Sequence, residues 1–184
     1  MKQRIPVATL TLLAITGLIT GLQFVFPEIL TALRRNPEAL RAGEWWRMIT
    51  PLFVHAEGWR QIAFNFTAIA FVGTIVERIY RSRLWLLFYF AGGLTGEIAG
   101  YAWKPYGAGA SVAGSGLLGA LAAWSISRKA PLQPRIGGCL LLLGAVMLTA
   151  LRDLHGPPIL LGAGIAALVL QQKRATSATE PGKT

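Results

Sequence analysis

The chain has 184 residues, of which 53% are hydrophobic and only 14% are charged. Together with several apolar runs of nearly membrane-spanning length, this composition excludes an ordinary soluble domain and predicts an all-α polytopic membrane protein. The net charge of +10 does not indicate a nucleic-acid partner, because the Lys and Arg residues cluster in short connections between the apolar runs, where they act as a topology signal. Cys139 is the single cysteine, so an internal disulfide is impossible.

The apolar runs predict one domain of six transmembrane helices, residues 1–172, followed by a polar tail, residues 173–184, that we expect to be disordered. The spans are expected at about residues 5–26, 59–80, 84–103, 111–127, 136–151 and 157–171. The last three are at or below the usual ~20 residues for a full crossing, which favours local thinning of the bilayer or helix ends recessed in a water-filled cavity.

A long polar connection, residues 28–50, separates the first two spans. It contains a break at Asn36-Pro37 and then the adjacent Trp45 and Trp46. An indole has an apolar body and one N–H donor, which suits the headgroup level of a membrane. We therefore expect this loop to lie on the lipid bilayer rather than in water.

The Lys and Arg residues also predict the orientation of the chain. With six spans, eleven of the 18 Lys and Arg residues fall on the side of the two termini and seven on the opposite side. Because cytoplasmic connections carry the excess of positive charge, we expect both termini in the cytoplasm and the chain in the bacterial inner (cell) membrane. The same assignment places Ser111 and His155 near the outer face, at the starts of the fourth and sixth spans.

Several polar side chains are set into the second and third spans. Gln61 and Asn65 are four residues apart and share one helix face, and Thr67 follows them. Polar groups at that depth are costly unless they are paired, so we expect all three to face the bundle interior. Glu97 in the third span is expected to face protein or to lie near the interface.

The glycine-rich stretch GAGASVAGSGLLGA, residues 107–120, indicates a helix that approaches its neighbours closely. Ser111 lies at its start, and His155 can act as a base near neutral pH. A Ser–His pair activates a hydroxyl when the two side chains come within roughly 2.6–3.2 Å. Gln61, Asn65, the Ser111 amide and His55 are candidate donors for a developing oxyanion. The same residues also fit a helix cap, polar contacts between helices and small-residue packing.

Several motifs follow one another in a fixed order along most of the chain. They are GEWWRMITPLFVH with Trp46, Arg47, Phe53 and His55; Asn65; Gly73 and Glu77; Gly109-Ala110-Ser111-Val112; Gly116-Leu117-Leu118-Gly119; and His155 with Gly162. In these motifs the chain from Gly43 to about Val169 resembles the rhomboid intramembrane serine proteases.

The resemblance implies a six-helix bundle with a membrane-lying first loop. It implies Ser111 as nucleophile, His155 as general base and then acid, and Asn65, Gln61 and His55 as oxyanion donors. The substrates would be membrane-anchored proteins cut in or next to their transmembrane segment, with no cofactor and no metal. The remaining motif residues would have structural roles: Trp46, Arg47, Gly73, Glu77, Gly109, Gly116, Gly119 and Gly162.

Three departures from the family pattern keep an alternative open. Val112 stands where the family has a glycine, Gln61 stands where it has a second histidine, and Pro157-Pro158 follow His155, which places His155 before the helix. The alternative is a catalytically inactive relative that binds transmembrane helices without cutting them. A small transporter or channel would be expected to show internal repeats or a pair of discontinuous helices, and the sequence shows neither.

Overall fold

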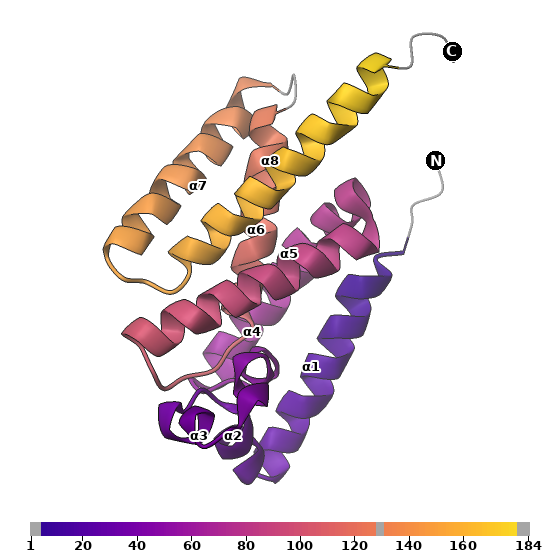
Figure 1. Ribbon diagram of the computed structural model, residues 1–184. Helices are drawn as coiled ribbons and strands as arrows, with labels where there is room; N and C mark the ends of the chain where they lie inside the picture. Colours follow the sequence, from indigo (N-terminus) through magenta and orange to yellow (C-terminus); the bar gives the residue numbers. More distant parts are fainter. Residues whose placement is uncertain (1–4, 128–130, 180–184) are drawn as a thin grey trace.

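The computed structural model describes residues 5–127 and 131–179, and all regular elements in these ranges are helical, as predicted. In chain order they are α1 (Val7–Val25), α2 (Glu28–Leu33), α3 (Pro37–Arg41), η1 (Trp45–Met48), η2 (Thr50–Phe53), α4 (Trp59–Ala68), η3 (Ile69–Gly73), α5 (Thr74–Trp103), α6 (Ser111–Ser127), α7 (Leu132–Ala150) and α8 (Gly156–Thr179). The start of α1 and the end of α8 lie at the same end of the molecule (Figure 1). Which side of the membrane this end faces stays a prediction.

Within the described residues, three helical stretches are long and apolar enough to cross a membrane: α1, the stretch Trp59–Trp103, and α7. Ser111–Ser127 and Gly156–Gln172 are shorter apolar helices. The stretch Trp59–Trp103 is broken at Arg81, whose φ of 69° lies in the left-handed region. The predicted second and third spans lie on either side of this break. The count of six spans stays a prediction.

Helix α6 contacts α5, α7 and α8, and it lies among them in the bundle (Figure 1). Its glycines permit backbone to approach backbone. A Cβ added at Gly116 would overlap the carbonyl oxygen of Phe88 in α5, and one added at Gly119 would overlap the carbonyl oxygen of Ile159 in α8. Ala113, Leu117 and other buried apolar residues of α6 belong to the same hydrophobic core. The small-residue stretch of the sequence is therefore the central packing surface of the fold.

The first helix is held against the rest of the bundle by Glu77. Its carboxylate accepts hydrogen bonds from the backbone N–H groups of Ala8 and Thr9, both at 2.8 Å, and from Thr9 Oγ1. A carboxylate at this place satisfies free N–H groups and lies at the positive end of the helix dipole. Gly73 allows the approach, since a Cβ there would lie 3.1 Å from Thr9 Oγ1.

The connection between α1 and α4 is folded back on itself and is fixed by Arg47. This buried side chain pairs with Glu44 and donates from Nη1 to the carbonyl oxygens of Thr31 and Arg34, at 3.0 and 2.8 Å. Trp45 and Trp46 are exposed, at 70% and 50% of their surface. Their exposure leaves the indoles free to meet a membrane, and the membrane-lying position of this loop stays a prediction.

Some expectations from the sequence need correction. Helix α7 begins at Leu132 rather than near residue 136, because Pro131 precedes the helix and Pro134 is tolerated in its first turn. The backbone of α8 stays helical to Thr179, so a disordered tail from residue 173 is wrong as far as that residue, and the rest of the tail lies outside the described residues. Gln, Lys, Arg and Ala near residues 171–175 are good helix formers and explain the extension. Thr67 is exposed rather than turned to the interior.

A buried ion pair joins the first loop to α5. Arg35 Nη1 lies 2.9 Å from Glu97 Oε1, and the two side chains are 5% and 0% exposed. Gly100 and Gly107 leave room for the guanidinium, since a Cβ at either would come within 3 Å of it. Glu97 thus faces protein, as expected, and its partner comes from a loop 62 residues away in sequence.

Candidate active site

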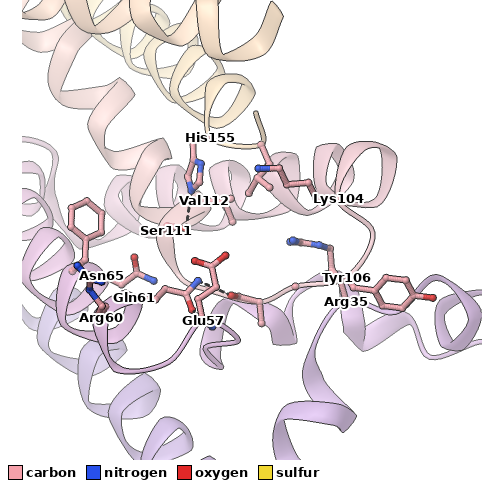
Figure 2. Close-up of a pocket in the computed structure, with 15 residues that line it drawn as sticks. Arg35, Glu57, Arg60, Gln61, Asn65, Lys104, Tyr106, Ser111, Val112 and His155 are labelled. Atoms are coloured by element: carbon pink, nitrogen blue, oxygen red, sulfur yellow. Dashed lines mark hydrogen bonds between the residues drawn. The ribbon is translucent and has the colours of Figure 1, made fainter. Parts of the chain in front are cut away.

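Ser111 and His155 meet where α6 and α8 both begin. Ser111 is the first residue of α6, and His155 immediately precedes α8. The Ser111 Oγ atom lies 2.9 Å from His155 Nε2, although the residues are 44 positions apart, and Figure 2 shows the imidazole directed at the hydroxyl. This separation is hydrogen-bond distance for a nucleophile and a base.

Helix packing and a proline-rich helix start bring the two residues together. A Cβ added at Gly162 would overlap the carbonyl oxygen of Gly116, so α8 lies directly on the backbone of α6. Pro157 and Pro158 occupy the first turn of α8, where a missing N–H costs little. His155 therefore stands in the turn before the helix, as the sequence predicts, and its ring reaches over the start of α6.

The structure adds Asp153, which the sequence did not single out. Its Oδ1 accepts a hydrogen bond from the backbone N–H of His155 at 2.9 Å and lies 2.7 Å from ring atom Nδ1. Its Oδ2 lies 3.7 Å from Lys104 Nζ. The signal in the sequence is an Asp two residues before a histidine at a helix start. In this pattern the Asp carboxylate accepts a hydrogen bond from the backbone N–H two residues further along the chain.

The Ser111 hydroxyl and the His155 ring line a cavity of about 540 Å³. Charged and amide side chains and one tyrosine form much of the remaining wall, and Figure 2 labels them: Arg35, Glu57, Arg60, Gln61, Asn65, Lys104 and Tyr106. A second cavity of about 330 Å³ also reaches Ser111 and His155, but apolar residues such as Phe64, Ile69 and Ile159 dominate its wall. The two residues thus lie where a polar and an apolar space adjoin.

Asn65 offers a free donor beside Ser111. It is 1% exposed and lines both cavities, and its Nδ2 finds no hydrogen-bond partner among the residues that the structure describes. A buried amide without a partner is costly, which favours a ligand that would accept from it. Gln61 lies on the same face of α4 and donates from Nε2 to the carbonyl oxygen of Ala108 at 2.9 Å. This bond uses one of the two N–H groups of the amide.

Comparison with known proteins assigns the chain to a family. Residues 42–169, more than half of the chain, match the family described as "Rhomboid domain". The chain belongs to the rhomboid family. The predicted family is confirmed, and the chain is an integral membrane protein with a polytopic helical bundle.

Two rhomboid relatives show how far the similarity extends. Over 112 residues, 60% of this chain, the sequence is 45% identical to "Rhomboid protease GluP" of Bacillus subtilis (strain 168), of which the match covers 22%. Over 80 residues, 42% of this chain, it is 32% identical to "Rhomboid-like protease 3" of Toxoplasma gondii, of which the match covers 30%. The chain therefore matches less than a third of the length of either relative.

The structure places His55 away from the candidate rhomboid site. The side chain is 1% exposed, is absent from the walls of both cavities, and has Nδ1 3.1 Å from Thr20 Oγ1 of α1. Gln23 of α1 also binds the backbone of His55. Its side-chain amide donates to the His55 carbonyl oxygen, and its Oε1 accepts from the His55 N–H. The geometry does not support His55 as an oxyanion donor, because the ring lies in the interface between α1 and the loop.

Val112, where the family pattern has glycine, lines the polar cavity and packs against α5. It is 1% exposed, and its Cβ and methyl groups fill the place where a side chain at Gly96 of α5 would lie. Gly96 therefore offsets the added bulk of Val112. Gly109 allows the side chain of Gln61 to lie against the backbone, since a Cβ at Gly109 would collide with the Gln61 amide.

Within residues 5–127 and 131–179, no three His, Cys, Asp or Glu side chains gather in a group that could hold an ion.

Proposed function

We propose that this rhomboid-family chain is an intramembrane serine endopeptidase, with Ser111 as nucleophile and His155 as general base and then acid. The observation that carries the proposal is the 2.9 Å separation of Ser111 Oγ and His155 Nε2 at the wall of a polar cavity. The names of the two relatives, both proteases, agree with it.

The chemistry follows from the two side chains. Ser111 Oγ adds to the scissile carbonyl carbon while its proton passes to His155 Nε2. The C–N bond breaks as His155 returns that proton to the leaving nitrogen, which leaves an acyl ester on Ser111. A water molecule then adds to the ester carbonyl carbon while His155 takes its proton. The bond from that carbon to Ser111 Oγ breaks as His155 passes the proton to Oγ, so the new carboxyl terminus leaves and the serine hydroxyl is restored.

Asn65 and Gln61 would stabilise the oxyanion of each tetrahedral intermediate. The free Nδ2 donor of Asn65 supports this role most directly, because no competing bond must break when the oxyanion forms. The Gln61 amide contributes its second N–H. Asn65 is 1% exposed, and a hydrogen bond from a buried donor to a charged oxygen is stronger than one made in bulk water.

The substrate class we propose is a membrane-anchored protein cut within or beside its transmembrane segment. A protease binds its substrate backbone in extended form, which an intact helix does not offer, so helix-breaking residues near the cut would help. The apolar cavity beside Ser111 would receive an apolar side chain next to the scissile bond.

Reconstituted proteolysis tests this function. The purified chain in liposomes would be mixed with a panel of single-span reporters that differ in the number of Gly and Pro residues near one end of the span. We expect wild type to cut the Gly- and Pro-containing reporters and Ser111→Ala to cut none. Folded wild type that binds reporters but cuts none would contradict the proposal and favour the inactive, helix-binding alternative. Equal cutting by Ser111→Ala would assign the activity to another residue.

A further inference from the structure

Asp153 lies in the tight turn between α7 and α8, where it faces both the backbone and the ring of His155. The turn is fixed by backbone hydrogen bonds from Arg152 to Thr149 at 3.0 Å and from Asp153 to Leu148 at 2.8 Å. Arg152 takes a left-handed φ of 57° to make it. The side chain of Asp153 is therefore placed by the fold, and its Oδ1 lies 2.7 Å from His155 Nδ1.

The two contacts of the His155 ring define where its proton must be. An ionised carboxylate only accepts hydrogen bonds, so Nδ1 must carry the hydrogen that points at Asp153. Nε2 then has a lone pair directed at the Ser111 hydroxyl, 2.9 Å away. This tautomer can take a proton from serine, whereas the one with hydrogen on Nε2 cannot.

We infer that Asp153 is a positioning residue for His155: its carboxylate holds the ring with the hydrogen on Nδ1 and stabilises the positive charge that the ring gains when it takes the proton of Ser111. The inference rests on the proposed nucleophile and base, and it adds a third group to a pair that the sequence suggested would act alone. Stabilisation of an imidazolium by a neighbouring carboxylate follows the general logic of Ser-His-Asp triads.

The charge state of Asp153 supports this role. Partial burial raises its pKa, but hydrogen bonds from the backbone N–H and the ring of His155 outweigh burial, so the pKa lies below its usual range. Among the described residues Lys104 also faces Asp153, with Nζ 3.7 Å from Oδ2, and its charge lowers the pKa further. Asp153 is therefore an anion at neutral pH, and its two oxygens are divided between His155 and Lys104.

A purely structural role would use only the backbone contact, in which Asp153 Oδ1 accepts from the N–H of His155. Asparagine can make the same bond with its carbonyl oxygen but carries no charge. The substitution Asp153→Asn therefore keeps the turn and removes the charge beside the ring. Asp153→Ala removes both. Glu28→Gln is the control, because it makes the same change of carboxylate to amide at an exposed position that lines neither cavity.

The rate of reaction with a fluorophosphonate, a reagent for activated serine hydroxyls, measures the effect on Ser111. Loss of the triad aspartate costs about 10⁴-fold in a buried triad, and because Asp153 is 29% exposed we expect a smaller loss, roughly 10- to 1000-fold, in Asp153→Asn. Glu28→Gln should react like wild type. Wild-type reactivity in folded Asp153→Asn would overturn the inference while leaving the Ser111 and His155 assignment intact.

Nitrogen NMR of histidine-labelled protein gives a second readout, one that a structural role would not move. The chain has only two histidines, so His155→Ala identifies the His155 signals. We expect hydrogen on Nδ1 in wild type and a shift toward hydrogen on Nε2 in Asp153→Ala. Wild-type His155 with its hydrogen on Nε2 would overturn the inference. This result does not depend on activity, so failure of the proposed function, seen as wild type without fluorophosphonate labelling, remains distinguishable.

Discussion

Gly162 of α8 rests on the backbone of Gly116 in α6, so closely that a single methyl group at Gly162 would overlap the Gly116 carbonyl oxygen. This contact lies between the helices that begin at Ser111 and directly after His155. Gly162→Ala must push the two helices apart, and overpacking of this kind typically costs about 1–3 kcal/mol. We expect a lower unfolding temperature in detergent and slower reaction of Ser111 with a fluorophosphonate.

Gly164→Ala is the matched control for this change. It lies on the same helix, and no atom lies within 4 Å of the Cβ it would gain. It should unfold and react like wild type. If the two alanine variants behave alike, the close approach of α6 and α8 is not what holds the reactive pair together.

The free amide of Asn65 leads to a second prediction. Asn65→Ala should slow the reaction of Ser111 with the fluorophosphonate by roughly 10²–10³-fold, the usual effect of losing one oxyanion donor. Gln61→Ala should have a smaller effect, because one of its N–H groups already binds the Ala108 carbonyl. Thr67→Ala, at an exposed position of the same helix, serves as the control. An Asn65→Ala protein that is folded and fully reactive would remove Asn65 from the site.

The all-helical class and the family follow from apolar run length and from ordered motifs, both of which are local properties of the sequence. The close approach of α6 to its neighbours is local in the same way, because Gly116 and Gly119 lack the side chain that would prevent it. A small-residue stretch between long apolar runs therefore indicates where helices meet.

Contacts between residues far apart in the chain could not be predicted from the sequence. His55 was a candidate oxyanion donor together with Asn65, but Thr20 of α1 binds its ring and Gln23 binds its backbone. No local pattern defines the register of α1 against the loop. Asp153 reaches His155 only because Arg152 turns the chain. Glu97 was expected to face protein, and its partner Arg35 could not be identified from two charges 62 residues apart.

The pair of Arg35 and Glu97 gives a third prediction. Removing one member of a buried ion pair leaves the other charge without a partner, at a cost of about 3–5 kcal/mol. Arg35→Met and Glu97→Gln should therefore each unfold at clearly lower temperature than wild type. The double variant Arg35→Met/Glu97→Leu should recover part of the loss, because it leaves no isolated charge.

The exposed Arg41, on α3 of the same loop, provides the control for Arg35. Arg41→Met should leave the unfolding temperature close to that of wild type. Single variants at Arg35 and Glu97 that are as stable as Arg41→Met would show that the buried pair does not anchor the loop.

His55 predicts a pH dependence of stability. Burial lowers its pKa from 6.5 to about 4, so the folded chain keeps the ring neutral at pH values where the unfolded chain binds a proton. This contribution is fully present above about pH 6.5 and is lost as the pH falls toward 4. From pH 7 to pH 5, the unfolding temperature of wild type should therefore fall more than that of His55→Gln, whose side chain binds no proton in this range. Equal losses would contradict a neutral, buried His55.

The central claim is that His155 activates Ser111, and mapping the site of fluorophosphonate attachment by mass spectrometry tests it most directly. The reagent needs a nucleophilic hydroxyl but no correct substrate. Ser115 is the internal control, because its Oγ donates to the Ser111 carbonyl at 2.9 Å. We predict one adduct, on Ser111, that persists in Ser115→Ala, disappears in Ser111→Ala and falls steeply in His155→Ala. Folded wild type that stays unlabelled, or labels only after Val112→Gly, would contradict the account and make the native chain a binder of transmembrane helices.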